Sequence, residues 1–170
     1  EEGMFRFLED IQADGIVVCS PRLPEERLVP LVEQFQNAVV VNGQGIAWRE
    51  LAGAIETDDA GGMKLAVEHL IASGRRHLTY LGGPPDARVS TERYLGFLNA
   101  LEATGHTSNP AWHTACHRAD LKGGYDAIKR LGDVLSEVDA MVCFNDLVAA
   151  GAIRACHEMG IRVPDDIAIT

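Results

Sequence analysis

Polar side chains recur shortly after apolar runs that have the length of buried strands. We select four of them as candidates for ligand binding: Ser20, Asn42, Arg93 and Asn145. An amide donates and accepts hydrogen bonds, and a guanidinium presents a planar set of donors that matches paired oxygens. These groups suit a small polyhydroxylated or similarly polar ligand. In parallel sheets, ligands bind beyond the carboxyl ends of the strands, so we expect these residues to face a crevice there.

Arg93 belongs to the segment Gly82–Phe97, whose two leading glycines allow the backbone to approach a ligand closely. We expect Arg93 in the first turn of the helix that follows, where its charge opposes the helix dipole and calls for a compensating partner. A ligand with paired oxygens is one such partner. The alternative is an ordinary surface ion pair with Glu92 or Asp86, a common contact that contributes little stability.

Each of the two asparagines also has two interpretations. Asn145 either binds a neutral hydroxylated ligand or forms a turn, with Asp146 as the N-cap of the following helix. Asn42 precedes Gly43, a pair typical of turns, or it faces the crevice from a second lobe. The sequence leaves both alternatives open.

Other patterns argue against catalysis and metal binding. His113, Cys116 and His117 fall in one expected strand, where positions 113 and 117 share a face and position 116 opposes them. No second group has the spacing of a tetrahedral zinc site. The chain contains no Gly-x-Ser-x-Gly elbow, dinucleotide fingerprint or Walker loop. We therefore expect no enzyme activity, no metal and no cofactor.

Short apolar runs alternate with helical stripes along the whole chain. The expected strands are 16–19, 38–41, 78–81, 112–117, 140–144 and one that begins near Ile167. All-apolar runs of this kind are typical of strands buried on both faces of a parallel sheet, so we expect an α/β fold. The long link from Asn42 to Ala54 predicts two lobes, at residues 1–57 and 58–170.

Charge and composition argue against some classes of function for this segment. The formal net charge of −10 and the scattered basic residues argue against nucleic-acid binding by this segment. No apolar run approaches the roughly 20 residues that span a bilayer. The four cysteines fall in apolar contexts, so we expect small buried side chains in a reducing compartment. They are Cys19, Cys116, Cys143 and Cys156.

Three stretches resemble LacI/GalR-type transcriptional regulators: Gly82–Phe97, Asn145–Ala152 and Arg162–Ile167. The resemblance covers nearly the whole chain. It implies a two-lobe, type I periplasmic-binding-protein-like effector domain with parallel sheets flanked by helices. Residues 1–57 would be part of the N-terminal lobe, and residues 58–170 the C-terminal lobe, incomplete at its end.

The same resemblance implies a cytoplasmic homodimer that senses a small sugar-like effector in the interlobe cleft. Operator DNA would be bound by an N-terminal domain absent from this chain, and no membrane would be involved. Arg93 and Asn145 match the ligand-binding arginine and asparagine of the family. Asn42 stands where many sugar-binding members have Asp, Ala119 where an aromatic often stacks, and Ser20 where polar contacts occur. The alternative is an exported solute-binding protein of a sugar transporter, which shares the fold.

Overall fold

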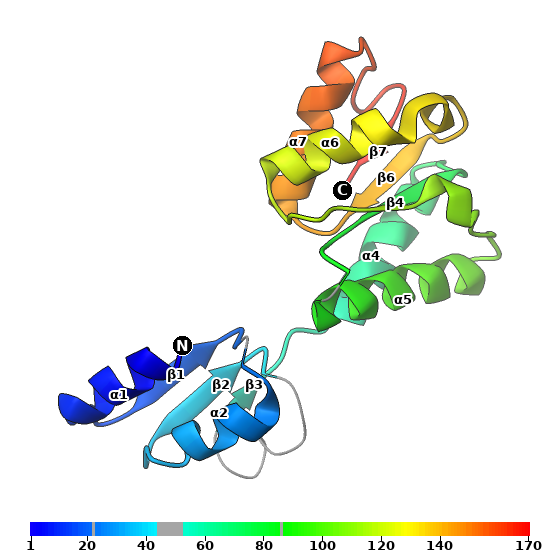
Figure 1. Ribbon diagram of the computed structural model, residues 1–170. Coiled ribbons are helices and arrows are strands. Elements are labelled where there is room, and N and C mark those ends of the chain that lie inside the picture. Colours follow the sequence, from blue (N-terminus) through cyan, green and yellow to red (C-terminus); the bar gives the residue numbers. More distant parts are fainter. Residues whose placement is uncertain (22, 44–52, 86) are drawn as a thin grey trace. The chain divides into compact units, whose positions relative to one another are not determined.

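The computed structural model describes residues 1–21, 23–43, 53–85 and 87–170. The chain divides into two compact units, Glu1–Thr57 and Asp58–Thr170 (Figure 1), and each is treated by itself below. Among the described residues, no helix is long and apolar enough to cross a membrane.

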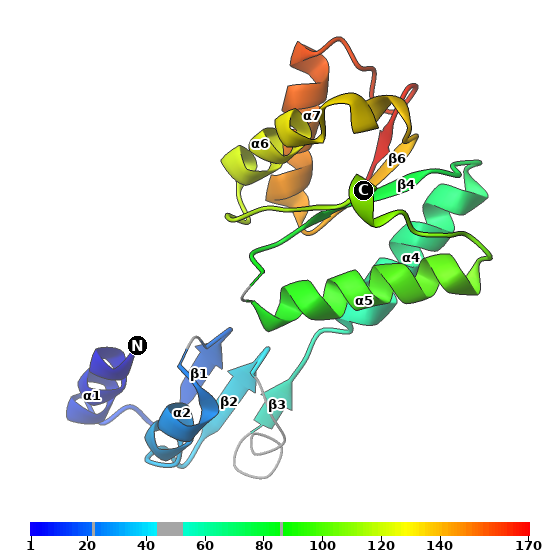
Figure 2. The same ribbon diagram turned by 45° about the vertical axis from the view of Figure 1, so that its right-hand side comes forward.

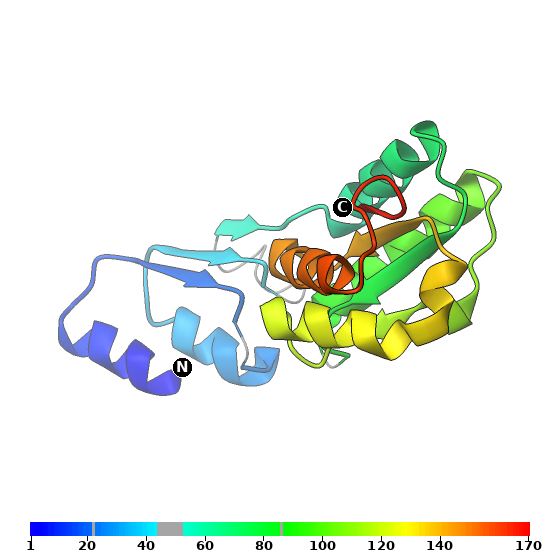
Figure 3. The ribbon, with the colours of Figure 1, turned by 90° about the horizontal axis from the view of Figure 1, so that it is seen from above.

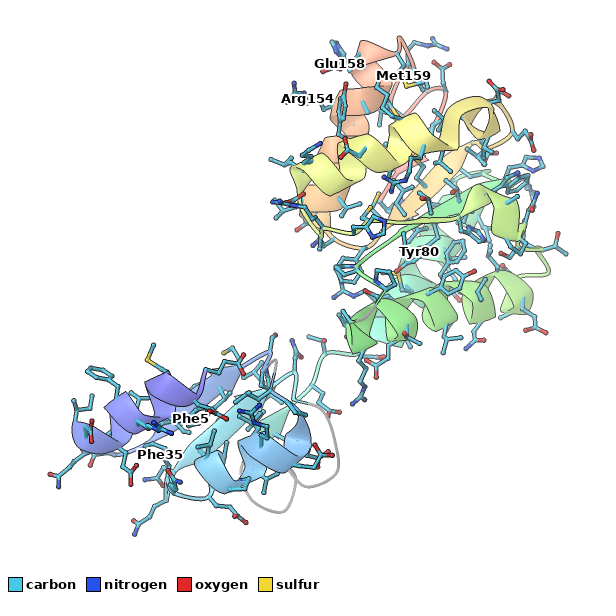
Figure 4. The ribbon with its side chains drawn as sticks, in the orientation of Figure 1. Phe5, Phe35, Tyr80, Arg154, Glu158 and Met159 are labelled. Carbon is cyan, nitrogen blue, oxygen red and sulfur yellow. The ribbon has the colours of Figure 1, made fainter. Side chains whose placement is uncertain are left out.

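The first unit is a small parallel sheet with helices on one face. Its strands are ordered β1 (Ile16–Cys19), β2 (Ala38–Val41), β3 (Gly53–Ile55). The helices α1 (Glu2–Asp10) and α2 (Glu25–Val32) lie on the same side of the strands (Figure 3). Between them and the sheet, Phe5 packs on Phe35 with ring centroids 6.3 Å apart (Figure 4).

Only one face of this sheet is buried, whereas the sequence predicted strands that are buried on both faces. Along β1, Ile16 is 7% exposed whereas Val17 is 67% exposed. The described helices cover one face of the sheet, so every second side chain meets no protein layer. Cys19 is exposed for this reason, and the prediction that all four cysteines are buried was wrong for it.

The second unit has a four-stranded parallel sheet covered on both faces. The strand order is β5 (Thr114–Ala115), β4 (Leu78–Gly82), β6 (Ala140–Cys143), β7 (Ala168–Ile169). Helices α4 (Asp59–Ala72) and α5 (Arg88–Ala103) cover one face, and α6 (Leu121–Leu131) and α7 (Asp146–Glu158) cover the other (Figures 1 and 2). The 3-10 turns η1 (Pro110–Trp112) and η2 (Gly132–Ser136) complete the unit.

Alternate residues of β4 and β6 supply two cores, as expected for strands buried on both faces. Tyr80 (labelled in Figure 4) and Val142 pack with α4 and α5. The ring of Tyr80 stacks on that of Phe97, with ring centroids 5.2 Å apart. Leu81 and Met141 belong to the core beneath α6 and α7. The predicted α/β fold with parallel sheets flanked by helices is therefore confirmed.

Helices α6 and α7 approach each other through glycines. A Cβ on Gly124 would overlap the carbonyl oxygen of Val148, and one on Gly151 would overlap that of Leu121. Larger side chains at these positions would force the two backbones apart, because packed interiors leave no spare volume.

The starts of three strands are tied together at the amino edge of this sheet. Arg75 donates to the carbonyl oxygens of Asp139, Pro164 and Asp165, at 3.3, 2.6 and 3.5 Å. The carboxylate of Asp139 accepts the backbone N–H groups of Arg76 and His77, each at 2.9 Å. These contacts fix the segments that lead into β4, β6 and β7.

The expected strand at 112–117 is reduced to the two residues of β5. Upstream of it, the imidazole of His113 replaces backbone pairing, since Nδ1 accepts the N–H of Tyr80 at 3.2 Å. Nε2 lies 2.5 Å from the hydroxyl of Ser108, so the neutral ring donates there. Burial lowers the pKa of His113 to about 4. This histidine is thus a structural group within the sheet.

Candidate functional site

A pocket of about 460 Å³ opens at the carboxyl edge of the second unit's sheet. It lies where β6 and β7 end and where α4 and α7 begin. Its lining comes entirely from the second unit: Asp58, Asp59, Gly62, Met63, Ala66, Arg93, Val142, Cys143, Phe144, Asn145, Asp146 and Thr170. Arg93 and Asn145, two of the four candidate residues, meet here.

Arg93 is the sixth residue of α5, in the second turn of the helix. The prediction that it occupies the first turn was wrong, and its charge therefore needs no compensation at the helix N-terminus. Its Nε donates to Oδ1 of Asp59 at 2.7 Å, and Nη1 donates to the carbonyl oxygen of Phe144. Its guanidinium carbon also lies 4.8 Å from the ring centroid of Phe144. One side chain thus connects α4, α5 and the residue that follows β6.

The alternative of a surface ion pair does not describe Arg93. Glu92 pairs instead with Arg88 at 2.6 Å, and Asp86 lies outside the described residues. The side chain of Arg93 is 25% exposed and that of Asp59 is 10% exposed, so this ion pair is half-buried. A guanidinium has five N–H donors, and the described contacts use one on Nε and one on Nη1. Among the described residues, none accepts a hydrogen bond from Nη2.

Asn145 is the N-cap of α7, a role expected for Asp146, which is instead the first residue of the helix. The Asn145 Oδ1 accepts the N–H of Val148 at 2.9 Å, and Nδ2 donates to the carbonyl oxygen of Ala119 at 3.2 Å. Each side-chain atom keeps one further hydrogen-bonding position. The structural role and a ligand contact are therefore compatible.

Asn42 and Ser20 belong to the first unit and do not line this pocket. Both are exposed and follow strands, with positive φ angles of 52° and 47°. The Asn42 Oδ1 accepts the N–H and the hydroxyl of Thr57 at 3.1 and 3.2 Å. The N–H of Ser20 donates to the carbonyl oxygen of Val41 at 2.8 Å. The left-handed backbone of Asn42 agrees with the turn interpretation of that residue. The ligand role of Asn42 and of Ser20 stays a prediction.

Sequence reasoning missed the carboxylates that line the pocket. Asp58 caps α4 by accepting the N–H of Gly61 at 2.8 Å. Asp59, one residue on, faces Arg93 instead. No local signal separates the two, because the role of Asp59 depends on how α4 packs against α5. The three carboxyl groups of the lining, those of Asp58, Asp59 and Asp146, outnumber its one guanidinium.

Comparison with known proteins identifies the class. The family model described as periplasmic binding protein-like domain matches residues 67–170. The chain belongs to this family, and the resemblance to LacI/GalR-type regulators is confirmed. The HTH-type transcriptional repressor PurR of Aliivibrio salmonicida is 30% identical over 166 residues, which are 96% of this chain and 49% of that protein. The chain thus spans about half the length of the curated relatives it matches.

Solved structures give the same class. A LacI transcriptional regulator from a Rhodococcus species is 26% identical, with a TM-score of 0.85 over 99% of this chain and 61% of that one. The transcriptional regulator CelR, in a complex with cellobiose, is 26% identical, with a TM-score of 0.81 over 99% of this chain and 51% of that one.

Proposed function

We propose that this chain is the effector-sensing and dimerisation domain of a DNA-binding transcriptional repressor. The observation that carries the proposal is the pocket at the carboxyl edge of β6 and β7, where Arg93 and Asn145 meet in a domain of this family. Residues 1–57 form part of the N-terminal lobe and residues 58–170 the C-terminal lobe. The domain has no catalytic role, in keeping with relatives that are named as regulators.

The effector is a small sugar-like or similarly polar molecule that binds at the pocket lined by Arg93 and Asn145. The free donors of Arg93 and the remaining hydrogen-bonding positions of Asn145 bind its hydroxyl groups from one side. Asn42 and Ser20 contribute from the N-terminal lobe. Their side chains follow strand ends, which is where ligands contact parallel sheets.

Effector binding controls the affinity for operator DNA, which an N-terminal domain outside this chain contacts. The repressor is a cytoplasmic homodimer, and the effector shifts the population between two arrangements of its lobes. The size of that shift is limited by the difference in effector affinity between the two states.

The alternative class is an exported solute-binding protein of a sugar transporter. The relatives reported above carry names of repressors and regulators, which supports the regulatory role. An operator-binding assay of the full-length protein decides between them: a repressor binds a specific DNA site and changes that affinity with effector, whereas a transport protein does not bind DNA.

A thermal-shift screen of the full-length protein against sugars, nucleosides and polyols tests the effector role. Cellobiose belongs in the panel because it is the ligand named for CelR. We expect at least one neutral polar compound to raise the melting temperature in a saturable manner. Binding that is confined to a flat outer surface, remote from Arg93 and Asn145, would contradict the proposal.

A further inference from the structure

The ion pair between Asp59 and Arg93 differs from the other arginine pairs of the second unit. Its side chains are 10% and 25% exposed, whereas those of Arg88 and Glu92 are 48% and 41% exposed. Three restraints act on one guanidinium: the carboxylate of Asp59, the carbonyl oxygen of Phe144 and the aromatic face of Phe144. A flexible side chain in contact with the pocket is thereby held in one orientation.

We propose that Asp59 is the positioning and specificity-determining residue of the pocket. It orients the guanidinium of Arg93 and cancels its charge, so that the remaining N–H groups bind an uncharged hydroxyl-bearing ligand and reject an anion. This inference rests on the effector function proposed above.

The positioning role follows from conformational entropy. A free arginine side chain loses rotamer freedom when it binds a ligand, and that loss weakens binding. The contacts with Asp59 and Phe144 impose this order before any ligand arrives. The ligand then meets donors that are already fixed.

The selectivity follows from the charges around the guanidinium. With Asp59 paired to Arg93, the pair carries no net charge that would attract an anion. Coulomb attraction by an unpaired guanidinium would act on a phosphate or carboxylate group but not on a neutral hydroxyl. The hydroxyl still gains hydrogen bonds to the guanidinium, which is a good donor whether or not its charge is balanced.

The positioning role is tested by nuclear magnetic resonance on the effector-free, full-length protein. The measured quantity is the rate at which the arginine Hε protons exchange with water. Arg93→Lys assigns the Arg93 signal, and Arg88→Lys assigns that of an exposed arginine in the same helix. Both Nε groups donate to a carboxylate, at 2.7 Å in Arg93 and 2.6 Å in Arg88, but the pair of Arg88 is exposed to water whereas the pair of Arg93 is half-buried. Because exposed ion pairs contribute little stability, we expect Hε of Arg93 to exchange with water about tenfold more slowly than Hε of Arg88. Equal exchange rates in the unmodified protein would overturn the proposal without any variant of Asp59.

Asp59→Asn keeps an oxygen acceptor but removes the charge. We expect it to abolish most of the exchange protection of Arg93, while Asp59→Glu retains part of it. Protection that persists in full in Asp59→Asn would overturn the positioning role. The backbone amide spectrum of each variant reports whether the fold is intact.

Inorganic phosphate, titrated in a phosphate-free buffer, tests the selectivity. We expect the Arg93 signal to shift in a saturable manner in Asp59→Asn and to stay unmoved in the unmodified protein. Equal shifts in both proteins would overturn the charge-cancelling role. These experiments need no effector, so they stand apart from the thermal-shift screen: a failed screen refutes the effector function, and a failed titration refutes only the role of Asp59.

Discussion

Arg93 connects three segments of the fold and is also the proposed ligand-binding residue. We therefore expect its substitution to change the stability of the protein and its effector affinity by different amounts. Arg93→Lys keeps a charge near Asp59 but cannot hold two neighbouring oxygens at once. We expect effector affinity to fall about tenfold to a hundredfold, the cost of one charge-assisted hydrogen bond. Calorimetry with a compound from the screen measures this.

Melting curves measure the contribution of Arg93 to stability separately from its contribution to effector binding. We expect Arg93→Ala to destabilise the protein by about 1–3 kcal/mol, because the half-buried carboxylate of Asp59 loses its guanidinium. Arg88→Lys, in an exposed pair, is the control and changes neither affinity nor stability. Unchanged affinity in Arg93→Lys would reduce this residue to a structural ion-pair partner.

His113 makes stability depend on pH. Its folded-state pKa of about 4 lies below the ordinary value of 6.5, so the fold favours the neutral ring. The contribution is complete above about pH 6.5 and is lost as the pH falls toward 4, by about 1–2 kcal/mol after allowance for partial solvent exposure. Urea unfolding at pH 7.5 and 5 measures it. His113→Asn, which accepts a hydrogen bond but does not titrate, should show a flatter dependence, and an identical slope would contradict the assignment.

Helices α6 and α7 depend on glycine where their backbones meet. Gly151→Ala would place a methyl group against the carbonyl oxygen of Leu121, and we expect a loss of at least about 2 kcal/mol. Gly62→Ala in α4 is the control: nothing lies within 4 Å of its added Cβ, and helix propensity predicts a gain of up to about 1 kcal/mol. Chemical unfolding of both variants measures the difference. Equal effects would mean that α6 and α7 can separate at little cost.

The sequence predicts an element well where the element is determined by its own residues. The buried strands β4 and β6 follow from their own apolar runs. The shortness of β5 could not be predicted in this way, because it depends on the imidazole of His113 reaching Tyr80 in another strand.

At the pocket, the sequence likewise predicts local features but not contacts between elements. That Asn145 follows a strand end is visible in the sequence, whereas the pairing of Asp59 with Arg93 requires the packing of α4 on α5.

Across the whole chain, one thiol of the four is accessible. Cys19 is exposed, whereas Cys116, Cys143 and Cys156 are buried and burial raises the pKa of each. In a protein made of residues 1–170, we expect a thiol reagent to modify one cysteine rapidly and the other three only on unfolding. Cys19→Ser should remove the rapid phase. Fast modification of a second thiol would show that the core of the second unit opens readily.

The charge of the whole chain predicts its behaviour toward DNA. With a formal net charge of −10, residues 1–170 should show no sequence-specific DNA binding at physiological salt. An electrophoretic mobility-shift assay checks this, with the full-length protein as the positive control. Specific binding by residues 1–170 alone would refute the assignment of this chain as the sensory part of a repressor.

Arg75 has a consequence for how this protein tolerates evolutionary change. Its partners are the backbone carbonyl oxygens of Asp139, Pro164 and Asp165, and every amino acid supplies such an oxygen. The side chain at position 165 can therefore change without breaking the hydrogen bond from Arg75, provided that the backbone path is kept. Selection acts instead on a single position, 75, where one codon change removes three hydrogen bonds at once.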